Sequence, residues 1–70
     1  MNNILAAQVL LSHLPDITDG AYKRATEIAI EVLYKDAYQD WCMLGSDAFM
    51  SAKDYLGLTE EEYRRWILRN

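Results

Sequence analysis

The sequence of 70 residues lacks the cysteines and histidines that stabilise many small domains through disulfides or bound zinc. It contains one cysteine and one histidine. Neither an internal disulfide nor a structural zinc site with four Cys and His ligands can therefore form. It also contains no linker, repeat or low-complexity segment. The chain must be held by its apolar side chains, which make up 51% of the residues, and we expect a single domain over residues 1–70.

Basic residues are also scarce. Seven Lys and Arg stand against eleven Asp and Glu, which gives a formal net charge of -4. Affinity for nucleic acid comes mostly from basic residues that neutralise phosphates. The charge balance therefore points away from nucleic acid and toward proteins or basic surfaces.

Long hydrophobic runs are absent as well. The apolar stretch at residues 4–11 is interrupted by Gln8 and is well short of the roughly 20 residues of a transmembrane helix. No Lys or Arg precedes it and no small-residue cleavage site follows it, so it does not resemble a signal peptide. We expect a cytoplasmic protein without membrane contact, which a lone thiol also suits.

Helix caps and breakers divide the first two thirds of the chain into two expected helices. Pro15 ends the first helix, because the residue before a proline is pushed out of helical geometry. Asp16 and Thr18 are competing N-caps for a second helix that begins at about Asp19. Gly45 then ends this helix as a left-handed residue.

Two further helices are expected after Gly45. Ser46 caps the third, and Gly57 closes it in a Schellman-type ending. Thr59 and Glu62 have the spacing of a capping box for the fourth. No segment has the alternating pattern or turn residues of a β-hairpin. The fold class is therefore all-α: a small bundle of about four helices, the last two forming a helix-turn-helix-like unit packed on the long second helix.

The long second helix has two apolar stripes in its sequence pattern. The stripe of its first half comprises Tyr22, Ala25, Ala29, Val32 and Leu33. The stripe of its second half comprises Ile30, Tyr34, Ala37, Trp41 and Leu44. We therefore expect one continuous helix that changes face midway and passes from one packing partner to another, with a kink or break at residues 34–36 as the alternative. Ala48 and Phe49 are expected on the third helix, and Trp41 and Trp66 are the expected anchors of the core.

The sequence provides no constellation of catalytic groups. His13 lies at the end of the first helix, where it interacts with the helix dipole. Cys42 has no histidine or basic cluster beside it in sequence, and we expect a half-buried, unreactive thiol. We therefore expect no enzymatic activity and no cofactor.

Paired carboxylates on the second helix offer a second possible chemistry. Glu27 and Glu31 lie one turn apart, as do Asp36 and Asp40. Two carboxylates without further oxygen ligands make a weak metal site, whereas Glu31 stands four residues before Lys35, in the orientation that favours an ion pair. We expect a solvated charged face and no metal, with mimicry of a short row of phosphates as the alternative.

The segment of residues 52–67 resembles a helix-turn-helix unit. Gly57 falls in the turn, Thr59 opens the second helix, and Tyr63 and Trp66 stand six and nine residues after the glycine. The resemblance implies a DNA-binding regulator. The residues that would contact nucleic acid are Thr59, Arg64 and Arg65.

The sequence of residues 55–66 is also similar to the ends of small α-helical proteins encoded by bacteriophages and prophages. It reads Tyr-Leu-Gly-Leu-Thr-Glu-Glu-Glu-Tyr-Arg-Arg-Trp. This similarity implies an inhibitor or regulator of a host machine. Anti-CRISPR and anti-transcription proteins are among the types it implies.

The favoured function is a non-enzymatic protein-interaction module, with a DNA-binding regulator as the alternative. Tyrosines and tryptophans exceed what so short a chain can bury, and these amphipathic rings suit interfaces. The expected partner is a host protein, bound by Glu27, Glu31, Tyr34, Tyr38 and Asp40. The first helix is apolar almost all round, so a homodimer is also expected. Its interface would include Leu5, Val9 and Leu10.

Overall fold

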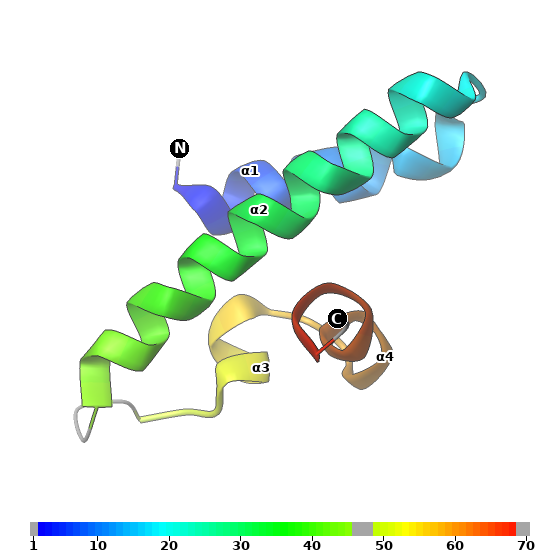
Figure 1. Cartoon of the computed structure of the whole chain (residues 1–70). Coiled ribbons are helices and arrows are strands. Elements are labelled where there is room, and N and C mark those ends of the chain that lie inside the picture. Colours follow the sequence, from blue (N-terminus) through cyan, green and yellow to red (C-terminus); the bar gives the residue numbers. More distant parts are fainter. Residues whose placement is uncertain (1, 46–48, 69–70) are drawn as a thin grey trace.

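The chain folds as an all-α bundle in which one long helix carries the other elements (Figure 1). This computed structural model describes residues 2–45 and 49–68, and within these ranges the elements are helices and the turns that join them. Their bounds are α1 Asn3–His13, the 3₁₀ turn η1 Leu14–Asp16, α2 Gly20–Leu44, α3 Ala52–Leu56, α4 Glu60–Tyr63 and the π-helical segment η3 Arg64–Leu68. Because α1, α3 and η3 all contact α2, the predicted bundle of about four helices is confirmed.

Helix α1 buries one side of its surface against α2. The Asn2 side chain caps it by accepting a hydrogen bond from the Leu5 backbone N–H at 2.8 Å, and the helix ends before Pro15 as predicted. Ala7 is fully buried, whereas Leu5 and Val9 are 50% and 45% exposed. The fold therefore buries only some of the apolar side chains that surround α1.

Helix α2 is continuous over 25 residues. The Asp19 carboxylate accepts a hydrogen bond from the Tyr22 backbone N–H at 2.9 Å, and Gly45 ends the helix with φ +55°. The predicted positions of both ends are therefore confirmed. The predicted caps Asp16 and Thr18 are wrong, because Asp19 caps the helix, and Gly45 has positive φ without the left-handed helical conformation. In the part of the chain that the structure describes, no helix is both long enough and apolar enough to cross a membrane.

The predicted change of face along α2 is wrong. The buried residues form one straight stripe at spacings of four, four and three, namely Thr26, Ile30, Tyr34 and Ala37. Tyr22 and Val32, assigned to the core by the pattern, are 64% and 60% exposed. Thr26 enters the stripe because its hydroxyl donates a hydrogen bond to the Tyr22 carbonyl at 2.8 Å, which satisfies the polar group locally.

Helix α3 begins later than predicted. The expected cap, Ser46, lies outside the described residues, and Ser51 caps the helix by accepting from the Asp54 backbone N–H at 3.3 Å. Phe49 precedes the helix and is 97% exposed. The indole N–H of Trp41 donates to the Met50 carbonyl at 2.9 Å. This bond holds a non-helical segment against α2, so the helix starts only after it.

The turn between α3 and α4 has the predicted geometry. Gly57 has φ +69°. The N–H groups of Gly57 and Leu58 donate to the carbonyls of Asp54 and Lys53, both at 3.1 Å, which is the Schellman pattern. Thr59 and Glu62 complete the capping box with reciprocal side-chain-to-backbone bonds. The expected helix-turn-helix order is thus present and lies against α2 (Figure 1).

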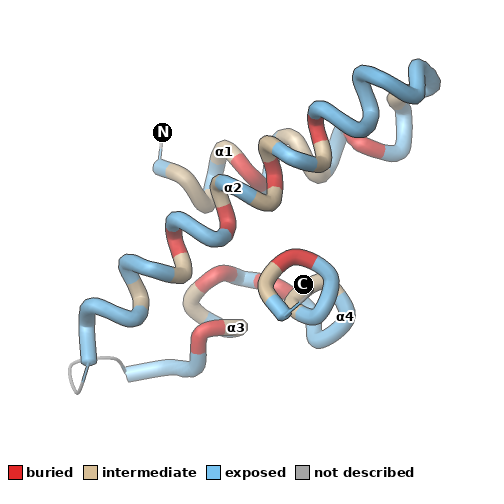
Figure 2. The backbone as a smooth tube through the Cα atoms, in the orientation of Figure 1, coloured by how far each residue is buried: buried red, intermediate tan, exposed pale blue. Residues whose placement is uncertain are grey.

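The buried residues form one cluster. Its members are Ala7, Leu14, Ile30, Tyr34, Ala37, Leu56, Leu58 and Trp66. Figure 2 shows where they lie along the backbone, on α1, α2, α3 and the C-terminal segment. Trp66 comes from η3 and is 3% exposed, so it is a core anchor as predicted. The other expected anchor, Trp41, is half-buried.

Replacing Trp66 tests its role as the anchor of the C-terminal elements. We expect Trp66→Ala to lower the free energy of unfolding by about 3–5 kcal/mol, because a large buried ring is lost and a cavity remains. Phe49→Ala is the control, with an expected change within about 0.5 kcal/mol because the ring is exposed. Urea unfolding followed by circular dichroism measures both, and a wild-type-like midpoint for Trp66→Ala would contradict this assignment.

Glycine substitutions test the turn at Gly57. We expect Gly57→Ala to destabilise the protein by about 1–2 kcal/mol, because an L-residue is strained at positive φ. The added Cβ would also lie 3.2 Å from the Gln8 side-chain nitrogen. Gly20→Ala is the matched control: nothing lies within 4 Å of its added Cβ, and a gain of up to about 1 kcal/mol is expected. Equal melting temperatures for the two variants would rule out a strained turn.

Candidate functional site

Two of the predicted partner-binding carboxylates are engaged in ion pairs. The Glu27 carboxylate lies 2.8 Å from an Arg65 guanidinium nitrogen, which links α2 to η3. Glu31 pairs with Lys35 at 2.8 Å, as its spacing predicted. The Arg65 guanidinium also lies over the Trp66 ring, 4.5 Å from its centroid. Part of the charged face of α2 is therefore used to hold the bundle together.

The predicted partner-binding tyrosines differ in accessibility. Tyr34 is 1% exposed, so its ring packs in the core and presents no surface to a partner. Tyr38 is half-buried and stacks on Trp41 with ring centroids 5.9 Å apart. Hydrogen bonding with the Cys42 side chain raises the pKa of Tyr38. Cys42 itself is exposed, not half-buried as expected.

The three residues proposed for nucleic-acid contact all interact within the chain. The Thr59 hydroxyl caps α4. Arg64 lies 3.5 Å from Glu60, and Arg65 is paired with Glu27. These acids place negative charge beside each arginine, where a phosphate would otherwise bind. The geometry therefore offers little support for a DNA contact through α4.

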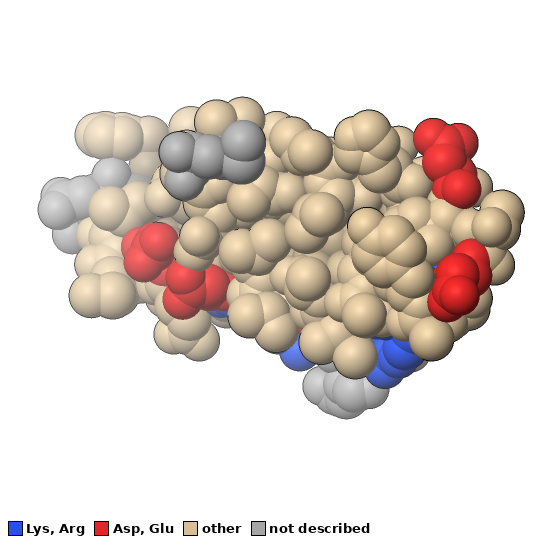
Figure 3. Space-filling model, turned by 90° about the horizontal axis from the view of Figure 1, so that it is seen from above, with Lys and Arg blue, Asp and Glu red and all other residues tan. Residues whose placement is uncertain are grey.

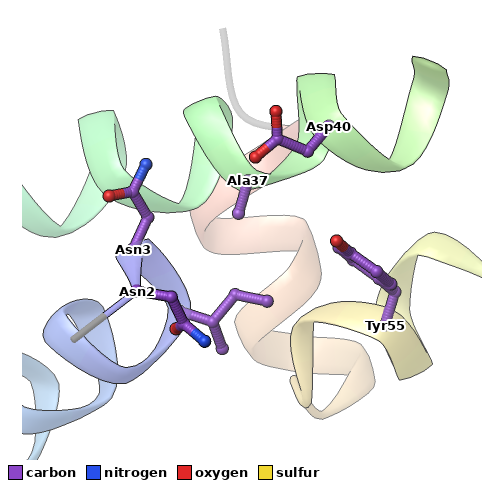
Figure 4. A pocket seen from close by; sticks show the side chains of 6 residues that line it. Asn2, Asn3, Ala37, Asp40 and Tyr55 are labelled. Atoms are coloured by element: carbon purple, nitrogen blue, oxygen red, sulfur yellow. The ribbon is translucent and has the colours of Figure 1, made fainter. Parts of the chain in front are cut away.

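A cavity of about 300 Å³ lies where the start of α1 meets α2 and α3 (Figure 4). Asp40 and Tyr55 line one side of it and the two asparagines of α1 line the other. The full lining set is Asn2, Asn3, Ile4, Ala37, Asp40 and Tyr55. The Asp40 carboxylate has no hydrogen bond or ion pair with a described residue. Within residues 2–45 and 49–68, no three His, Cys, Asp or Glu side chains are grouped as a metal site would need.

A second feature is an apolar surface on the side of α1 and α2 that faces away from α3 and α4. Val32 and Ile28, one turn apart on α2, are 60% and 47% exposed. A shallow hollow of about 430 Å³ joins Val32 and Leu33 to Asn3 of α1. We call this surface the α1–α2 face, and its hollow is lined by Asn3 of α1 with Val32, Leu33, Lys35, Asp36 and Gln39 of α2. Leu5 and Val9 of α1 and Ile28 of α2 are further exposed aliphatic residues of the same two helices.

The α1–α2 face carries little charge except at its ends. Helix α1 contains no Asp, Glu, Lys or Arg. Figure 3 looks down on α1 and α2 and shows a broad uncharged area with acidic residues at both ends and basic residues along one edge. At the end near the cavity, the Asp36 carboxylate accepts a hydrogen bond from the Asn3 side-chain amide. The face thus combines exposed apolar groups with an acidic margin.

The predicted site residues fall into separate places. Of the residues predicted as a dimer interface, Leu5 and Val9 are exposed on α1, whereas Leu10 is partly buried against the core. Asp40 lines the cavity. Glu27 and Glu31 belong to the ion-paired side of α2 instead. Sequence reasoning missed the second part of the face, Ile28 and Val32. Their i, i+4 spacing as two large aliphatic residues on one side of the helix was the signal that could have found them.

Comparison of the chain with protein-family models, with curated proteins and with solved structures gives no match. The function must therefore be argued from the face and the cavity themselves.

Alkaline unfolding tests the placement of Tyr34 in the core. Burial, with the nearby Glu62 charge, raises the pKa of Tyr34 above its usual 10.0. A raised folded-state pKa contributes stability below pH 10, and this stability is lost as the pH rises toward the folded value. We expect the wild-type free energy of unfolding to fall more steeply above pH 10 than that of Tyr34→Phe. Urea titrations at pH 8, 10 and 11 measure this, with exposed Tyr22→Phe as the control; parallel curves for wild type and Tyr34→Phe would contradict it.

Proposed function

We propose that this protein is a non-enzymatic protein-interaction module that binds its partner through the α1–α2 face. The observation that carries the proposal is the exposure of four large aliphatic side chains on two helices that pack on each other, Ile28 and Val32 of α2 and Leu5 and Val9 of α1. Large aliphatic side chains that stay exposed together mark sites of protein association. The face is built on two helices that pack on each other, so it offers a rigid surface that loses little conformational freedom on binding.

A host protein is the proposed partner class. The similarity to phage- and prophage-encoded proteins implies an inhibitor or regulator, such as an anti-CRISPR or anti-transcription protein. Such a protein acts by covering a surface of its target and requires no catalytic group. A small, rigid apolar face suits that mode of action.

A DNA-binding function has weaker support. The net charge is -4, and α4 begins with Glu60, Glu61 and Glu62. Acids at the start of a recognition helix would meet phosphates and the acceptor atoms of guanine unfavourably. We therefore favour the interaction module over the helix-turn-helix regulator.

A pair of matched variants tests the proposed face. We expect Val32→Glu to abolish capture of the partner from an extract of the native host, because a carboxylate would be desolvated at an apolar contact. Met43→Glu is the control: it places the same charge on the same helix at a site that is 82% exposed and lies beyond the face. Mass spectrometry identifies the captured protein, and binding of the purified pair is then measured by calorimetry.

The fold of both variants is checked by circular dichroism, and little change is expected because both sites are exposed. If wild type and Val32→Glu bind the purified partner equally well, the α1–α2 face is not the binding surface. If no protein binds the wild type, the interaction module itself is wrong.

A further inference from the structure

The cavity and the α1–α2 face form one continuous surface. Asn3 lines the cavity with Asp40 and Tyr55, and it also lines the hollow with Val32 and Leu33. A partner segment seated on the apolar side chains of α2 would therefore pass directly beside the mouth of the cavity. Whatever side chain it carries at that point would enter a site with its own chemistry.

The lining of the cavity fits a long side chain with a cationic end. Among the described residues that line the cavity, Asp40 alone is charged, and its carboxylate has no partner among them or elsewhere in residues 2–45 and 49–68. The Tyr55 hydroxyl and the asparagine side chains supply further polar atoms, while Ala37 contributes apolar wall. Lys and Arg combine an apolar stem with a charged head, which is the pattern that such a lining accommodates.

An anion fits the same cavity poorly. The N-terminus of α1 alone would attract negative charge. However, the Asn2 side chain already caps it by accepting from the Leu5 N–H, and the full charge within the lining is negative. The favoured ligand is therefore a cation.

We propose that the cavity beside Asp40 receives a Lys or Arg side chain of the partner protein, next to apolar side chains that the partner seats on the α1–α2 face. This inference rests on the proposed function and names the chemistry of the partner. The Asp40 carboxylate pairs with the cationic head, and Tyr55 with the asparagines of α1 surrounds it. The partner segment thus combines an apolar stripe with a basic residue at its end.

A second copy of this chain is a less suitable occupant of the same surface. Each copy carries a net charge of -4, and the α1–α2 face has acidic residues at both ends (Figure 3). Stacking two such faces brings acidic ends together in either orientation, and like charges in contact are unfavourable. Charge complementarity selects a basic partner instead.

The cavity is tested first with a small probe, n-butylguanidinium chloride, added to the isotopically labelled full-length protein. We expect saturable NMR shifts of the Asn2 and Asn3 side-chain amides, with a dissociation constant in the millimolar range. We expect Asp40→Asn to weaken this binding at least fivefold. Asp54→Asn, which removes an exposed acid outside the cavity, should leave it unchanged. The neutral analogue n-pentanol and matched sodium chloride should give no saturable shift.

The captured partner provides the second test. We expect Asp40→Asn to weaken the purified complex at least fivefold, to reduce its salt dependence, and to leave the fold unchanged. The inference is overturned if the probe does not bind the wild type, or if Asp40→Asn binds probe and partner as the wild type does. In either case the Val32→Glu result still decides the proposed function separately. A wild-type dimer in sedimentation that Val32→Glu converts to monomer would assign the face to a second copy and overturn the basic partner.

Discussion

The whole arrangement depends on one buried stripe along α2. Thr26, Ile30, Tyr34 and Ala37 lie almost in line, and a single line of buried residues is enough to receive α1 on one side and the C-terminal helices on the other. No disulfide shares this task, because the chain has one cysteine. The C-terminal elements are held to the stripe by the buried ring of Trp66 and by the ion pair between Arg65 and Glu27.

The use of a single buried stripe also explains why apolar residues of α2 stay exposed. A stripe that serves two packing partners occupies one side of α2, so the apolar residues on the opposite side, Ile28 and Val32, have no element of this chain to pack against. Of the acids of α2, Glu27 and Glu31 form ion pairs, whereas Asp36 bonds to Asn3 and Asp40 lines the cavity. The cavity follows from the same geometry, because the start of α1 and the end of α3 lie beside the same part of α2 (Figure 4). The candidate surface is thus a consequence of how the core was built.

The parts of the fold that were predicted correctly are those decided by a few neighbouring residues. Asp19 and Gly45 bound α2, and Gly57 with the capping box shapes the last turn. The parts that were wrong depend on distant contacts. The start of α3 follows Ser51, next to Met50, whose carbonyl accepts a hydrogen bond from Trp41 of α2, nine residues earlier. Cys42, expected to be half-buried, is exposed, and Tyr34, expected to contact a partner, is buried, because packing against other helices decides which side of α2 is covered.

The sequence by itself determined the number of long elements, most of their ends, the all-α class and the apolar surplus of α1. Capping and helix-breaking act within a few residues, so they can be found without knowing the fold. Only the tertiary structure decided which of the two apolar stripes of α2 is buried, and therefore that Val32 and Ile28 join Leu5 and Val9 as exposed residues. It also brought Asn3, Asp40 and Tyr55, from three different helices, around one cavity. Helical periodicity places residues on a side of a helix, but the contacts with the rest of the chain choose the side that faces water.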